Sequence, residues 1–214
     1  MCLKEDNGNY RTYQIRLKNS HPLYDYFSEQ SRLTKNLYNH ANFFIRQVYT
    51  ALTQEKPWQP NQQTVMETLT HYLPIINENQ QQAWEKRAEE TKSGTRKQNR
   101  AKPRVFSSPT KKKSYLGYPF LNALFRTMQE ENYRALSSQT AQGVLKNLHQ
   151  NWQSFFASQK EYQKDPDKFL GKPRIPHYLD QDCLKEITFT NQDCRVKNAK
   201  SLQFPGTQKS LEYW

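Results

Sequence analysis

Amide and basic side chains recur at helical spacing in two segments of this 214-residue chain. In the first, Asn39 and Asn42 lie three residues apart beside Tyr38, and Arg46 follows one turn later. In the second, one face would carry Gln139, Gln142, Lys146, Asn147, Gln150 and Gln153. An amide can pair with an adenine edge through two hydrogen bonds, and a cation contacts phosphate. These residues therefore suit nucleic-acid recognition, and the alternative is that the amides cross-link or cap helices within the fold.

The second set lies on a helix that the sequence predicts from residue 138 to residue 165. Ser138 can cap its free N–H groups, and Pro166 ends it because proline disfavours helical backbone in the residue before it. Apolar residues recur there at steps of three and four: Ala141, Val144, Leu145, Leu148, Trp152, Phe155 and Phe156. A stiff, basic, extended segment follows at 171–176. One apolar face and one basic-amide face suit a nucleic-acid groove, and equally an ordinary core helix.

The first set lies on a helix predicted at 23–52, which follows a predicted strand. Residues 10–18 alternate between apolar and polar, a pattern typical of a half-buried strand, here with a basic outer face. Pro22 lies where proline starts a helix. The buried stripe of this helix is expected to contain Phe27, Leu33, Leu37, Ala41, Phe44, Ile45 and Val48. Asparagine has weak helix propensity, so the amides at 39 and 42 are poor choices for helix stability alone.

Between these two helices the sequence predicts a short helix at 61–73 and then a flexible basic arm at about 86–116. The arm has many more lysines and arginines than acids and includes Lys111, Lys112 and Lys113. We expect it to order on a phosphate backbone, with a solvated linker as the alternative. Gly117 and Pro119 then start a helix that contains Phe120, Leu124, Phe125 and Met128.

After residue 178 the period changes from helical spacing to alternation, which predicts a β-meander. The expected strands contain Ile187 and Phe189, then Cys194 and Val196, then Leu202 and Phe204, with turns at 191–193 and 198–200. The predicted fold class is α+β: a small split β-barrel, formed by 1–20 and 169–214, that carries a long helical insertion at 21–168.

Composition favours a polyanionic partner. The chain has 32 lysines and arginines against 20 acids, a net charge of +12 and a pI near 9.5. Three cysteines without a C-x-x-C pair, and five scattered histidines, indicate neither a disulfide framework nor a zinc ribbon. No signal-peptide core and no apolar run of membrane length occurs. We therefore expect a cytoplasmic protein without a cofactor, a bound metal or a membrane partner.

Five short segments, in order, resemble the TnpB family. They are KNLYNHAN at 35–42, LSSQTAQ at 136–142, WQSFF at 152–156, GKPRIPHY at 171–178 and ITFTN at 187–191. TnpB proteins are compact RNA-guided DNA endonucleases of insertion sequences, related to type V CRISPR effectors. The resemblance covers nearly all of this chain but only the amino-terminal half of the family.

The resemblance implies a wedge domain, formed by the split barrel, and a recognition domain, formed by the inserted helices. Together they would hold a guide RNA and read a short motif in double-stranded target DNA. By similarity, the motif-reading residues are Tyr38, Asn39, Asn42, Ser138, Gln139 and Gln142. The expected backbone contacts are Arg46, Lys146, Lys172, Arg174, Lys111, Lys112 and Lys113.

The resemblance does not extend to the family's RuvC-like nuclease domain, with its three metal-binding carboxylates, or to its zinc ribbon. The acids near the end of this chain, Asp180, Asp182, Glu186, Asp193 and Glu212, do not lie in the expected strand context. We therefore expect RNA-guided binding without cleavage, with occupancy of DNA as a means of repression. The alternatives are a fragment or decayed copy of an active TnpB nuclease, a guide-independent RNA-binding protein, and a helical interaction module.

Overall fold

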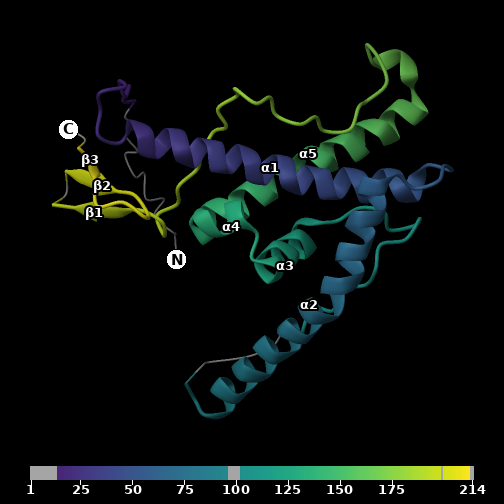
Figure 1. Cartoon of the computed structure of the whole chain (residues 1–214), viewed down its shortest axis with the longest axis horizontal. Coiled ribbons are helices and arrows are strands. Elements are labelled where there is room, and N and C mark those ends of the chain that lie inside the picture. The colour runs from purple at the N-terminus through teal and green to yellow at the C-terminus, as the bar shows by residue number, and fades with distance from the viewer. Residues whose placement is uncertain (1–13, 96–101, 199, 213–214) are drawn as a thin grey trace, which may run out of the picture.

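The computed structural model describes residues 14–95, 102–198 and 200–212. It shows a helical body with a small sheet at one end, and one helix that extends away from the body (Figure 1). The helices are α1 (Tyr24–Thr53), α2 (Pro60–Lys92), α3 (Tyr118–Met128), α4 (Glu131–Ala135), α5 (Ser138–Lys164) and the 3₁₀ helix η1 (Pro166–Lys168). The strands are β1 (Arg195–Lys197), β2 (Ser201–Gln203) and β3 (Ser210–Glu212).

The two amphipathic helices predicted from the sequence, α1 and α5, are present and pack against each other in one core. Trp152 of α5 has no exposed surface, and its ring lies edge-on to that of Tyr49 of α1, with centroids 5.4 Å apart. The predicted α5 stripe is buried, apart from the partly buried Phe156. The cap is Ser137, one residue earlier than predicted, since its side chain accepts a hydrogen bond from the Thr140 N–H.

Helix α2 corrects the prediction of a short helix at 61–73, because it continues through Pro74 to Lys92. Val65, Leu69 and Ile76 pack in the core. Beyond them the helix is mostly polar, but glutamine, glutamate, alanine and lysine are strong helix formers. Gln81 bonds Glu85, and Gln82 bonds Glu78, each across one turn. Local propensity therefore supports the helix where few of its side chains are buried in the core.

The basic arm predicted at 86–116 is not one segment. Residues 86–92 belong to α2, residues 96–101 lie outside the described part, and residues 102–116 return along the body. Asn77 of α2 donates to the Phe106 carbonyl and accepts from the Phe106 N–H, at 2.9 and 2.8 Å. Leu116 is only 4% exposed. The described part of this stretch is therefore attached to the core on both sides of its lysine-rich turn.

Helix α3 begins after Gly117, as predicted, with Pro119 in its first turn. It ends at Gln129, whose positive φ of 55° places it in the left-handed region. Glu130 then caps the short helix α4 by accepting a hydrogen bond from the Tyr133 N–H.

The sheet has three antiparallel strands in the order β1-β2-β3, and Leu202 pairs with Val196 on one side and Leu211 on the other. The fold is therefore α+β, and the described residues show this three-stranded sheet but do not show the split barrel. The strand predicted around 187–190 is irregular, and Phe189 packs on Phe204 instead, with ring centroids 5.2 Å apart. Residues 14–18 of the predicted first strand are also irregular, and residues 10–13 lie outside the described part.

In the described residues, no helix has the length and apolar character needed to cross a membrane.

Candidate nucleic-acid interface

The return segment, residues 171–188, runs back from the end of α5 and is attached to α1 by side chains. Ser31 donates to the Lys185 carbonyl at 2.7 Å, and Lys35 donates to the Gln181 carbonyl. Asn39 forms two hydrogen bonds with Leu179, donating to its carbonyl at 2.9 Å and accepting from its N–H at 2.8 Å. The side chains of one helix thus bind the backbone of an extended segment, as a neighbouring strand would.

Asn42 and Arg46 continue the same row. Asn42 donates to the carbonyls of Pro176 and His177, at 3.0 and 3.1 Å, and accepts from the indole N–H of Trp152 at 2.9 Å. Arg46 donates to the Pro176 carbonyl at 2.7 Å. Asn42 has no exposed surface, so it is not available to a base in this structure.

The amides of α1 therefore serve the alternative use that the sequence left open, which is to cross-link the fold. The five bonding residues on α1 follow one another at steps of three or four, so they form one stripe along the helix: Ser31, Lys35, Asn39, Asn42 and Arg46. The polar stripe on the side of α1 opposite its apolar stripe indicated that this face contacts something. Periodicity alone does not show which segment of the chain it contacts.

Two neighbouring hollows of about 530 and 340 Å³ lie between α5 and the return segment, and we call them together the α5 groove. The α5 residues that line it are Gly143, Lys146, Asn147, Gln150, Asn151, Ser154, Phe155 and Ser158, with Thr140 and Val144 at one end. At 1.5 Å per residue, the stretch from Gly143 to Ser158 is about 22 Å long. The return segment thus lies opposite the basic-amide face of α5.

Three of the predicted site residues, Tyr38, Lys146 and Arg174, line this groove. Tyr38 is only 4% exposed and lies in its floor, where its hydroxyl accepts a hydrogen bond from Asn151 at 2.9 Å. Lys185, which the sequence did not single out, lies 4.7 Å above the Tyr38 ring.

The charge in the groove is predominantly positive. Among the described lining residues, Glu186 alone is acidic, against Lys146, Arg174 and Lys185. Burial lowers the pKa of Lys185 below its usual value, although the nearby Glu186 opposes this shift. Lys185 donates to Asn147 at 3.1 Å. The Lys146 ammonium also lies 5.5 Å from the centre of the Tyr118 ring of α3. An anionic ligand would therefore meet positive charge in both hollows of the groove.

Near one end of the groove, Arg46 lies 4.8 Å from the centre of the Tyr178 ring, which is 41% exposed. Burial raises the pKa of the Tyr178 hydroxyl, which therefore stays a neutral donor. An exposed tyrosine beside arginines offers a face on which an unpaired base can stack.

The remaining predicted residues lie elsewhere. Gln142 accepts a hydrogen bond from Tyr118 at 3.2 Å, on the side of α5 that faces α3, and Gln139 donates to Gln192 at 2.7 Å. Exposed positions outside the groove lining are Ser138, Lys172, Lys111, Lys112 and Lys113. Lys113 lines a separate hollow beside α3.

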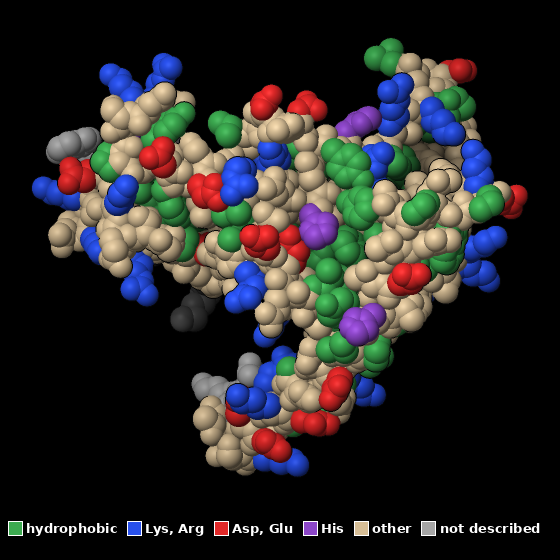
Figure 2. Space-filling view, viewed as in Figure 1, with side chains coloured by type: hydrophobic (Ala, Val, Ile, Leu, Met, Phe, Trp, Pro, Cys, Tyr) green, Lys and Arg blue, Asp and Glu red, His purple; other side chains and the backbone are tan. Residues whose placement is uncertain are grey.

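The sequence also missed a basic hollow between α2 and α3, about 560 Å³ in volume. Lys86 and Arg87 of α2 meet Arg126 of α3 there, and none of the described lining residues is acidic. Arg126 is distant in sequence from the other two, so no local pattern could bring them together. The space-filling view shows lysines and arginines spread over the visible face rather than gathered in one patch (Figure 2).

In the described residues, no group of three or more histidine, cysteine, aspartate or glutamate side chains is placed to hold a metal ion. Comparisons with protein families, curated proteins and solved structures found no match to this chain.

Proposed function

We propose that this chain binds nucleic acid in the α5 groove, as an RNA-guided DNA-binding protein of the TnpB type that does not itself cut. The observation that carries the proposal is the groove, because an almost acid-free channel lined by amides, lysines and an arginine suits a phosphate backbone. The α5 stretch from Gly143 to Ser158, which lines it, is about 22 Å long and corresponds to about six phosphates of one duplex strand at an axial spacing of roughly 3.4 Å.

The hollow between α2 and α3 would extend the backbone contacts, since Lys86, Arg87 and Arg126 converge there. The overall charge of +12 supports the same reading. Motif reading would fall to the exposed start of α5, where Ser138 and Gln139 lie, and not to the buried Asn42. That the ligands are a guide RNA and double-stranded target DNA rests on the resemblance to TnpB.

The test is a salt titration of binding to structured RNA. If about six phosphates are engaged, affinity should fall roughly a thousand-fold between about 50 and 200 mM salt. Lys146→Ala and Arg174→Ala should each weaken binding to all sequences alike. Each should also reduce the slope of log affinity against log salt concentration by about one. Lys56→Ala, an exposed lysine between α1 and α2, is the matched control and should change neither quantity.

A flat salt titration would contradict the proposal, and so would groove variants that behave like Lys56→Ala. A second experiment separates guided from unguided binding. RNA that co-purifies with the protein is sequenced, and DNA targets with and without complementarity to it are compared. Binding that ignores complementarity would favour the guide-independent alternative.

A further inference from the structure

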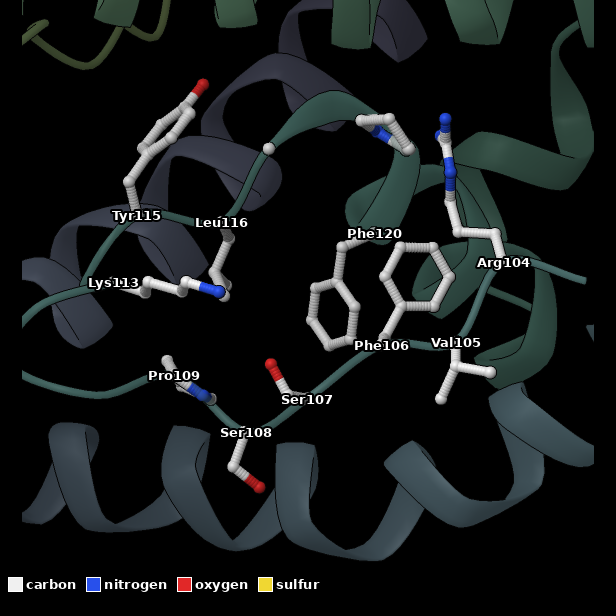
Figure 3. A pocket seen from close by; sticks show the side chains of 12 residues that line it. Arg104, Val105, Phe106, Ser107, Ser108, Pro109, Lys113, Tyr115, Leu116 and Phe120 are labelled. Carbon is white, nitrogen blue, oxygen red and sulfur yellow. The ribbon is translucent and has the colours of Figure 1, made fainter.

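A hollow of about 380 Å³ lies between residues 104–109 and the start of α3, away from the α5 groove (Figure 3). We call it the aromatic hollow. Its apolar wall is made by Phe106 and Phe120, whose ring centroids are 5.2 Å apart at an interplanar angle of 69°. Val105, Pro109, Leu116 and Pro119 add to the apolar lining. This volume lies within the range of about 300–1,000 Å³ that is common for small-ligand pockets.

Two polar groups point into this space. Figure 3 shows the ammonium of Lys113 and the hydroxyl of Ser107 directed toward the gap between Pro109 and Phe120. The hydroxyl of the next residue, Ser108, points away from the gap. The hollow thus combines flat apolar surface with one cationic donor and one hydroxyl, which is the chemistry that an unpaired base requires.

The aromatic hollow is held open by contacts outside its cavity. Asn77 fixes the backbone of Phe106 through two hydrogen bonds, and Phe120 is 7% exposed within the core. Thr110 and Lys113 close a tight turn through two backbone hydrogen bonds of 3.2 and 2.8 Å. Because both walls are fixed in the free protein, a ligand need not order them, which lowers the cost of binding.

Positive charge surrounds the hollow. The exposed turn presents Lys111, Lys112 and Lys113 in succession, and the exposed Arg104 belongs to the opposite rim. No aspartate or glutamate is among the described residues that line it. An apolar hollow beside a row of lysines matches one nucleotide unit, with the base inside and the phosphates on the turn.

We propose that the aromatic hollow takes one unpaired, extruded base of a bound RNA, which the Lys113 ammonium contacts, while Lys111 and Lys112 of the same turn contact the flanking phosphates. This inference rests on the proposed nucleic-acid binding and adds a site that selects unpaired nucleotides. An ammonium donates but cannot accept, so Lys113 favours a base with adjacent acceptors, as guanine has at O6 and N7. Adenine, with a donor at N6, fits less well.

The experiment compares RNA hairpins that differ at one bulged position, which carries guanosine, adenosine or an abasic unit. Binding of the full chain is measured by fluorescence anisotropy at fixed salt. The bulged guanosine should bind at least about fivefold more tightly than the abasic bulge, the lower limit expected for stacking of one base. Adenosine should lie between the two.

Three variants locate the effect. Ser107→Leu fills the hollow from an exposed position and should abolish the difference between base and abasic bulges. Ser108→Leu adds the same side chain on the neighbouring residue and should leave the difference intact. Lys113→Met keeps the aliphatic stem but removes the ammonium, so guanosine and adenosine should become equal while both still exceed the abasic bulge. Circular dichroism melting confirms that each variant is folded.

The outcomes distinguish this inference from the proposed function. Salt-dependent RNA binding without any bulge preference would overturn the aromatic hollow alone, as would a preference that Ser107→Leu retains. No RNA binding at any salt would overturn the proposed function, and the role of the hollow with it.

Discussion

The side chain of Asn42 makes three hydrogen bonds without reaching solvent, and they join three parts of the molecule. Its amide N–H groups bind the return segment, and its oxygen binds the indole of Trp152 on α5. An amide is suited to this position because it both donates and accepts. The same property would suit it to reading a base, so residue type alone does not distinguish the two roles.

Asn42→Ala should therefore destabilise the fold. It leaves the Trp152 N–H and the His177 carbonyl without this partner, while the Pro176 carbonyl keeps its hydrogen bond from Arg46. An unpaired buried polar group costs about 1–3 kcal/mol. Urea unfolding should show this loss, and binding to every nucleic acid should weaken alike as folded protein is lost. Asn36→Ala, on a partly exposed position of the same helix, is the control. Unchanged stability with an altered motif preference would contradict the structural role of Asn42.

Gln139→Ala should instead leave the stability of the fold unchanged and alter the preference for the DNA motif. Gln139 lies at the start of α5, and its side chain bonds the exposed Gln192, so truncation should leave the melting temperature nearly unchanged. If its amide reads a base, one base pair of the target motif should lose about 1–3 kcal/mol of discrimination. A binding selection on DNA with a randomised motif measures this. An unaltered motif profile would remove Gln139 from the site.

At the scale of elements, Glu130 connects three helices. It caps α4, and its carboxylate pairs with His40 of α1 at 3.0 Å, beside Phe125 of α3. Burial raises the pKa of Glu130, but hydrogen bonds from His40, Asn132 and the Tyr133 N–H outweigh it, so that the pKa lies below its usual value. Only 4% of the side chain is exposed, so solvent screens these contacts little.

This shift makes a prediction about acid stability. A carboxyl whose pKa is lower in the folded state stabilises the protein above its unfolded pKa, and this contribution is lost as the pH falls through the folded pKa. Glu130→Gln should cost about 1–3 kcal/mol near neutral pH, and the difference from wild type should shrink below about pH 4. Urea unfolding across this range measures it, with the exposed Glu131→Gln as control. If the difference in unfolding free energy between Glu130→Gln and wild type did not change with pH, the charge of Glu130 would make no contribution to stability.

At the scale of the whole molecule, the acids near the sheet and the return segment are dispersed. Asp193 is bound in its own turn, where it accepts hydrogen bonds from the Thr190 N–H and hydroxyl at 3.0 Å and from Ser137. Two-metal cleavage of a phosphodiester requires acids clustered around both ions.

We therefore expect no divalent-metal-dependent cleavage of DNA or RNA by this polypeptide. Incubation of labelled duplex and RNA with Mg²⁺ or Mn²⁺ measures it. Cleavage that co-elutes with the protein and disappears in Asp180→Ala, Asp182→Ala or Asp193→Ala would contradict this expectation. Cleavage that survives all three substitutions would indicate a co-purifying nuclease.

The sequence by itself determined the two main helices and their buried faces, apart from Phe27 and Phe156, which were predicted to be buried and are only partly so. Spacing of three and four residues, as in Leu37, Ala41 and Ile45 or in Leu145, Leu148 and Trp152, follows directly from helical geometry, so no tertiary information is needed to find it. The start of α3 could likewise be predicted from the local sequence, because Gly117 and Pro119 set the backbone conformation there. The helical extension of α2 was missed because a polar helix without an apolar stripe gives no periodic signal.

Only the tertiary structure decided what the polar residues do. Asn39 and Asn42 donate hydrogen bonds to carbonyls of the return segment, which lie more than 130 residues away in the sequence. Phe189 belongs to an aromatic cluster with Phe27 and Phe204, and not to the strand that its alternation predicted. The aromatic hollow joins residues on both sides of the 110–113 turn. Periodicity records which face of an element is polar, but the partner of a hydrogen bond depends on which segment folding brings beside it.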